Sequence, residues 1–212
     1  FEIACHANGG MSLGVYRDTL DDEVGYLVKS AKVKFAYAED QEQVDKLINV
    51  QKKLKTKIKV IYDDPRGLEK LKNPNVINMK DLASEGKKQL DKNNKVYENL
   101  INKVSGETVS VLCTTSGTTS NPKLAMLPAN KFINHISNYL KVDPKSHLDE
   151  YVSVLPFPWI MEQTYGVGFN LLSGMKVNFP ENSETAMDDL REIGPTFMLG
   201  APRLWEQISA DM

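Results

Sequence analysis

The sequence predicts an α/β fold with largely parallel sheets flanked by helices. Short apolar runs at 34–38, 58–62 and 109–113 have the length and composition of buried strands. Helical stretches of about ten residues or more lie between several of these runs. Because parallel strands need crossover connections, repeated alternation of strand and helix favours parallel sheets. The chain shows no internal repeat and no low-complexity tract.

The first half of the chain alternates in this way. A helix end at 1–8 stops at Gly9 and Gly10, which favour a helix C-terminus. A helix is expected at 21–30, with Asp21 or Thr19 as its N-cap. The predicted strands of this half lie at 13–16, 34–38, 58–62 and 75–78.

Two further helical regions complete this half. The helix at 41–54 is amphipathic, and its apolar face carries Val44, Leu47, Ile48 and Leu54. A turn at 63–67 follows the strand at 58–62. The polar, lysine-rich stretch 81–103 is expected to be helical, with a loose connection near 91–94.

The second half opens with two strands. The run 124–127 is too short for a helix and is followed by Pro128, so it is expected to form a strand after the one at 109–113. Helices are predicted at 130–140, 162–172, 183–193 and from about 203 onward. Further strands are predicted at 151–155, 176–179 and 196–199.

The loop between the first two of these strands is the most informative segment for function. Residues 114–123 crowd hydroxyl side chains and one glycine ahead of Lys123. Backbone N–H groups, hydroxyl donors and a cation together suit the phosphates of a nucleotide. A solvated turn has a similar composition, but the lysine and the leading strand favour phosphate binding. The P-loop of nucleotide hydrolases is excluded, because Lys123 follows Pro122 and does not open a helix.

Three motifs in order resemble the adenylate-forming (AMP-binding) superfamily, and within it the long-chain acyl-CoA synthetases. Residues 115–123, Thr-Ser-Gly-Thr-Thr-Ser-Asn-Pro-Lys, resemble its phosphate-loop signature Thr-Ser-Gly-Thr-Thr-Gly-x-Pro-Lys-Gly. Residues 155–162 resemble the Leu-Pro-Leu-x-His-x-x-Glu segment, and 194–206 resemble the later Pro-Thr…Val-Pro-Arg segment. The chain departs from these patterns where two glycines and a histidine are replaced by Ser120, Leu124 and Trp159.

The resemblance implies ATP-dependent activation of a long-chain fatty acid to an acyl-adenylate, followed by transfer to coenzyme A. Pyrophosphate and AMP are the products released. Lys123 and Thr118 would act in catalysis, with Mg²⁺ sharing the phosphate charge. The residues that would bind the phosphates of ATP are Thr115, Ser116, Gly117, Thr118, Thr119, Ser120 and Lys123. No metal ligand is predicted in the chain.

A second group of residues would bind the other substrate. Phe157 and Trp159 would line the acyl or adenylate pocket, although a tryptophan flanked by prolines is also a common packing residue. Glu162 is assigned to the same substrate-binding set. Two roles are open for it: a residue behind those that touch substrate, or a negative charge at a helix N-terminus.

The same resemblance implies that residues 1–212 form an incomplete N-terminal AMP-binding domain. The C-terminal part of the large domain and the small C-terminal domain would be absent, and that part of the chain would be a partner. Without the later motifs, the 212-residue chain alone is expected to be inactive. Two alternatives stay open: an acyl-AMP ligase that delivers to a carrier protein, and a non-catalytic nucleotide-binding remnant.

The composition of the chain limits the classes of partner that it is expected to bind. The net charge of −2 and the 25% of charged residues are those of an ordinary soluble protein, and a cytoplasmic location is expected. The lysines at 52–59 have no aromatic stacking platform beside them, so nucleic-acid binding is not expected. Peripheral contact with an anionic membrane would suit an enzyme that takes up fatty acids. Cys5 and Cys113 are expected to be free thiols.

Overall fold

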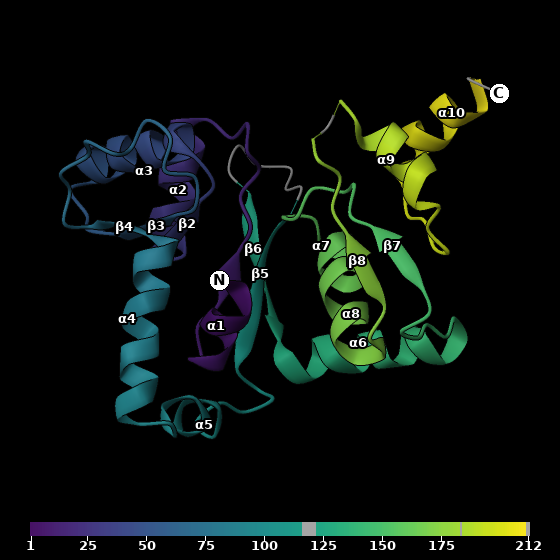
Figure 1. The fold of residues 1–212 in the computed structure, drawn as a ribbon, viewed down its shortest axis with the longest axis horizontal. Coiled ribbons are helices and arrows are strands. Elements are labelled where there is room, and N and C mark those ends of the chain that lie inside the picture. Colours follow the sequence, from purple (N-terminus) through teal and green to yellow (C-terminus); the bar gives the residue numbers. More distant parts are fainter. Residues whose placement is uncertain (116–121, 183, 211–212) are drawn as a thin grey trace. The chain divides into compact units, whose positions relative to one another are not determined.

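The computed structural model describes residues 1–115, 122–182 and 184–210 (Figure 1). The chain divides into two compact units, Phe1–Ser105 and Gly106–Met212.

The first unit is built on a three-stranded parallel sheet. Its strands are β2 (Phe35–Ala38), β3 (Lys59–Tyr62) and β4 (Val76–Asn78), with β3 in the centre. Val60 of β3 pairs with Ala36 on one side and with Val76 on the other. This parallel pairing confirms the prediction from alternating strands and helices.

Helices complete this unit, and two of them supply core residues to the sheet. They are α1 (Glu2–Ala7), α2 (Asp21–Ser30), α3 (Gln41–Leu54), α4 (Met79–Lys92) and α5 (Val96–Ile101); β1 (Ser12–Leu13) follows α1. Two clusters of aliphatic side chains are buried between α2, α3 and the sheet. Their buried members are Val24, Val28, Val50 and Ile58 in one, and Ala38, Val44, Val60 and Leu68 in the other.

Several details of the first unit differ from the prediction. The N-cap of α2 is Leu20, which makes no side-chain cap hydrogen bond, so the assignment of Asp21 or Thr19 was wrong. The strand expected at 13–16 is confined to Ser12–Leu13. The apolar face of α3 includes Val50, 1% exposed, which the prediction omitted. The break between α4 and α5 lies at 93–95, close to the predicted connection.

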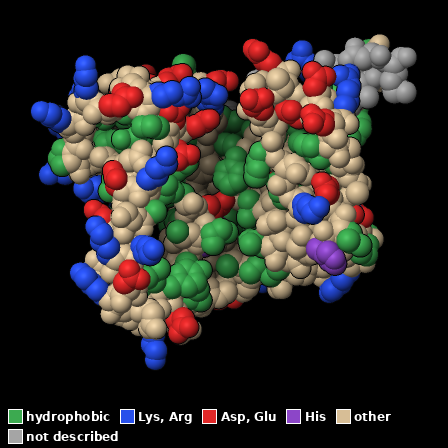
Figure 2. Space-filling model, in the orientation of Figure 1, with side chains coloured by type: hydrophobic (Ala, Val, Ile, Leu, Met, Phe, Trp, Pro, Cys, Tyr) green, Lys and Arg blue, Asp and Glu red, His purple; other side chains and the backbone are tan. Residues whose placement is uncertain are grey.

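Several lysines of this unit are exposed to solvent. Lys57 and Lys59 are exposed, and they alternate with the buried residues Ile58 and Val60. Such alternation is the pattern of a strand with one solvated face. Basic and acidic side chains are interspersed over the face of the unit that Figure 2 shows.

The second unit combines an antiparallel hairpin with a parallel pair. β5 (Val109–Thr115) and β6 (Lys123–Pro128) form the hairpin, and β7 (Glu150–Val152) pairs in parallel with β8 (Lys176–Asn178). The strand predicted at 196–199 is reduced to one bridge between Tyr151 and Phe197. The chain there continues through Pro202 into a helix, which leaves little length for pairing.

The helices of this unit enclose an aromatic core. They are α6 (Ala129–Val142), α7 (Ile160–Glu162), the π-helix η1 (Gln163–Phe169), α8 (Asn170–Ser173), α9 (Ala186–Ile193) and α10 (Pro202–Ala210). The helix predicted at 162–172 is therefore a continuous helical stretch with a π-helical centre. Its buried cluster contains Ile136, Tyr151, Tyr165, Phe169 and Met175. Among the described residues, no helix has the length and apolarity that crossing a bilayer requires.

Candidate active site

The hairpin of β5 and β6 brings the two ends of the predicted phosphate loop together. Thr115 and Lys123 are cross-strand partners, and the Thr115 hydroxyl donates a hydrogen bond to the Lys123 carbonyl at 3.3 Å. Both residues are exposed. The predicted strand–loop–strand arrangement is therefore present, and it presents one hydroxyl and one cation at the mouth of the loop.

The packing of β5 positions these two residues. Val111, Leu112 and Cys113 are buried, so the central part of the strand is anchored in the unit. Cys5 and Cys113 are not joined in a disulfide. The other predicted phosphate-binding residues, Ser116, Gly117, Thr118, Thr119 and Ser120, lie outside the described residues.

The predicted substrate-binding residues lie in the segment that connects β7 to α7. Phe157 is 46% exposed although it is a large apolar residue. Trp159 is half-buried and is the N-cap of α7, and Glu162 is the last residue of that helix. Among the described residues, no hydrogen bond connects this group to Thr115 or Lys123.

Glu162 is enclosed, with only 1% of its surface exposed. The Tyr151 hydroxyl donates to its Oε2 at 2.7 Å, and the Ser153 hydroxyl donates to its Oε1 at 2.5 Å. Burial raises the pKa of the Glu162 carboxyl, while the two hydroxyl donors act in the opposite direction. Burial also raises the pKa of Tyr151, and the nearby Glu162 carboxylate adds to the effect.

Gln163 continues this buried polar group. It is 3% exposed, and its Nε2 donates to the Phe157 carbonyl at 3.1 Å. The sequence reasoning missed Tyr151, Ser153 and Gln163. A signal for the first two was present, because residues two apart along a strand direction point to the same side.

The described residues contain no group of three or more His, Cys, Asp or Glu side chains placed to hold a metal ion. The described part of the site therefore offers no preformed set of Mg²⁺ ligands. Where Mg²⁺ binds with few protein ligands, substrate phosphates supply much of its coordination.

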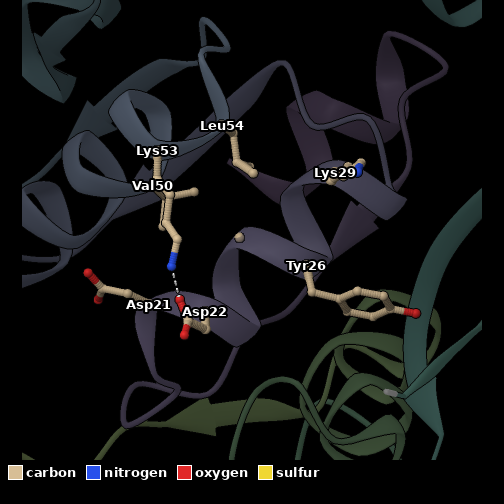
Figure 3. A pocket seen from close by; sticks show the side chains of 8 residues that line it. Asp21, Asp22, Tyr26, Lys29, Val50, Lys53 and Leu54 are labelled. Carbon is tan, nitrogen blue, oxygen red and sulfur yellow. Dashed lines mark hydrogen bonds and ion pairs between the residues drawn. The ribbon is translucent and has the colours of Figure 1, made fainter. Parts of the chain in front are cut away.

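A cavity of about 260 Å³ lies between α2 and α3 of the first unit (Figure 3). Gly25, Val50 and Leu54 form its apolar lining, and Lys53 pairs with Asp22 at its rim. This cavity includes none of the predicted site residues.

The fold of the chain is similar to that of proteins of known structure. VinN matches with a TM-score of 0.70 at 18% identity, over 99% of this chain and 46% of that one. The luciferase-like enzyme from the nonluminescent Zophobas morio mealworm matches with a TM-score of 0.70 at 14% identity, over 95% and 44%. At these identities the likeness shows the fold alone.

The family model described as AMP-binding enzyme matches residues 1–212, and the chain belongs to that family. Long-chain-fatty-acid–CoA ligase ACSBG1 of Rattus norvegicus is 28% identical over 208 residues, which cover 94% of this chain and 28% of that protein. Long-chain-fatty-acid–CoA ligase ACSBG2 of Homo sapiens is 27% identical over 205 residues, 94% of this chain and 30% of that protein. The chain thus spans less than a third of the length of these relatives.

Proposed function

We propose that the complete protein is an AMP-forming long-chain fatty acid–CoA ligase. The fatty acid carboxylate would attack the α-phosphate of ATP, which gives an acyl-adenylate and pyrophosphate. The coenzyme A thiol would then displace AMP. The observation that carries this proposal is the hairpin that pairs Thr115 with Lys123 at the mouth of the signature loop. The two relatives named as long-chain-fatty-acid–CoA ligases support the choice of substrate.

The first step joins two anions and therefore needs positive charge and hydrogen-bond donors at the phosphates. Lys123 supplies a point charge at the start of β6, and Thr115 supplies a hydroxyl opposite it. Thr118 and Lys123 take the catalytic roles in this proposal, and Ser116, Gly117, Thr119 and Ser120 hold the β- and γ-phosphates. Mg²⁺ would be held largely by the phosphates of ATP and would share their charge.

We propose that the acyl group binds beside Phe157 and Trp159. Phe157 presents an exposed aromatic ring, and Trp159 a half-buried one, from the segment before α7. Aromatic side chains bury large apolar areas, which suits an aliphatic chain or an adenylate. We place the enzyme in the cytoplasm with peripheral contact to a membrane; release from washed membranes by high salt, without detergent, tests that placement.

Replacement of the loop lysine tests the function. In the full-length protein, Lys123→Met is expected to lower palmitate-dependent ATP–pyrophosphate exchange by roughly 100-fold or more, because a charge at the transition state is removed. Lys131→Met is the control, since Lys131 is an exposed lysine of α6 in the same unit. Equal activity of the two variants would contradict the role of Lys123.

The acceptor is tested by adding coenzyme A to the wild-type protein. Formation of palmitoyl-CoA is the expected result. If palmitate and ATP give hydroxamate in the presence of hydroxylamine but coenzyme A gives no thioester, the acceptor is a carrier protein. If neither product forms and no pyrophosphate exchange occurs, the ligase proposal is wrong and the chain is a non-catalytic remnant.

A further inference from the structure

Three consecutive polar side chains are buried where α7 passes into the π-helix η1. Glu162, Gln163 and Thr164 are 1%, 3% and 3% exposed. Burial of a polar group is costly unless it is hydrogen-bonded, and burial of a carboxylate costs more. The hydrogen-bond partners of these side chains therefore indicate the structural role of the buried group.

Glu162 uses both carboxylate oxygens within the protein. Its two donors are Tyr151, the middle residue of β7, and Ser153, the first residue after that strand. Ser153 is also the first residue of the segment 153–159 that carries Phe157 and Trp159. The carboxylate thereby ties the start of this segment to the helix that follows it.

The middle and the end of the segment are tied to the same place. Gln163 Nε2 donates to the Phe157 carbonyl at 3.1 Å. The Trp159 carbonyl accepts from the backbone N–H of Glu162 at 3.0 Å and from that of Gln163 at 3.3 Å. Residues 162 and 163 thus hold the segment at three points.

A glycine in the helix leaves room for the Glu162 carboxylate. Gly166 lies one turn after Glu162, and a Cβ atom at that position would be 2.3 Å from Glu162 Oε1. Any other residue at 166 would displace a carboxylate that two hydroxyls hold. The surrounding π-helix is a feature that is frequent at functional sites.

We propose that Glu162 is a positioning residue, which fixes the segment 153–159 through Tyr151 and Ser153 so that Phe157 and Trp159 meet the acyl substrate. Both oxygens of Glu162 are engaged and it is buried, whereas Phe157 is 46% exposed. The part of this inference that concerns substrate rests on the proposed function.

Hydrogen exchange of the full-length protein, resolved to peptides covering 153–163, tests the positioning. Ser153→Ala and Tyr151→Phe each remove one donor to Glu162, and each is expected to speed exchange in these peptides by roughly 5- to 10-fold, the effect of one lost hydrogen bond. Thr164→Val is the matched control. Thr164 is equally buried, but its hydroxyl donates to Ile160 of its own helix at 3.0 Å. Exchange that is the same in all three variants would overturn the proposal.

Steady-state kinetics provide a second test of the positioning role. Ser153→Ala is expected to raise the KM for palmitate by roughly 5- to 10-fold and to leave the KM for ATP within about 2-fold, because only the acyl end is loosened. Glu162→Gln is expected to retain part of the wild-type behaviour, since an amide oxygen still accepts one of the two hydroxyl bonds. Loss of turnover in Glu162→Gln with unchanged exchange at 153–163 would show that Glu162 acts on substrate directly, and would overturn the proposal.

Hydrogen exchange and kinetics together distinguish a failure of the positioning role from a failure of the ligase assignment. If exchange responds as expected but the wild-type protein activates no fatty acid, the ligase assignment fails and the coupling of Glu162 to the segment stands. If the wild type is active and exchange does not respond, the positioning role alone fails.

Discussion

The cores of the two units contain different types of side chain. The buried clusters of the first unit contain aliphatic side chains alone, and no charged residue is buried there. The second unit buries aromatic rings together with Glu162, Gln163 and Thr164. An aliphatic core needs only volume and pattern, whereas buried polar groups must each find a partner. The core of the second unit therefore depends on specific polar partners, and the buried clusters of the first unit do not.

The aromatic rings of the second unit contact one another closely. The ring centroids of Tyr165 and Phe169 are 4.8 Å apart in an edge-on arrangement, and those of Tyr165 and Phe197 are 5.2 Å apart. Such pairs contribute beyond the area they bury. The core that supports the Glu162 segment thus depends on a few large side chains.

Removal of one of these rings is therefore expected to have the largest effect on stability. Phe169→Ala, at a residue that is 0% exposed, is expected to lower the free energy of unfolding of the second unit by about 3–5 kcal/mol. Ile58→Val, the comparison in the aliphatic core, is expected to cost only about 0.5–1.5 kcal/mol. Urea unfolding measures both, and hydrogen exchange assigns each loss to its unit. A loss below about 1.5 kcal/mol in Phe169→Ala would contradict the dependence of the aromatic core on a few large side chains.

This contrast also explains how far the sequence could predict the structure. In the first unit, the bounds predicted for the helix at 41–54 agree with α3, because a regular apolar stripe and the N-cap at Asp40 determine them. In the second unit, the helix predicted at 162–172 is present, but its π-helical centre was not foreseen. A π-helix leaves no periodic signature in the sequence, since it depends on a packing partner such as the Glu162 carboxylate.

The candidate site was predicted to a similar extent. The motif at 115–123 and its hairpin follow from local pattern, and the structure places Thr115 and Lys123 together. The partners of Glu162 could not be read from a motif, because Tyr151 and Ser153 meet the carboxylate only after β7 and α7 have packed. Contacts of this kind depend on tertiary structure rather than on residue spacing.

A smaller effect is expected at two helical glycines, one in each unit. Gly166→Ala places a methyl group against Glu162 Oε1 and is expected to destabilise the protein by about 1–3 kcal/mol. Gly86→Ala in α4 meets nothing within 4 Å and is expected to stabilise by about 0.5–1 kcal/mol, since alanine favours helix. Thermal unfolding of both variants measures the difference. A stabilising Gly166→Ala would show that the carboxylate is not held where the hydrogen bonds place it.

The smallest effect concerns the charge of Glu162, and its sign follows from its pKa. Burial raises this pKa in the folded protein above its unfolded value of about 4.3. The folded state therefore binds the proton more tightly. The resulting stability is fully present below the unfolded pKa and is lost as the pH rises through the folded pKa.

Glu162→Gln is neutral at every pH and lacks this contribution, so it isolates the charge of Glu162. The stability of the wild type relative to the variant is expected to fall from pH 4 upward and to level off above the folded pKa. Urea unfolding of the two proteins at a series of pH values measures the difference. Asp149 and Glu150, whose pKa values are lowered by hydrogen bonds from Ser146 and Lys176, contribute with the opposite sign, but they are common to both proteins and cancel. A difference that rises with pH would instead mean that the hydroxyls of Tyr151 and Ser153 outweigh burial, and that the second unit stabilises a charged carboxylate in its core.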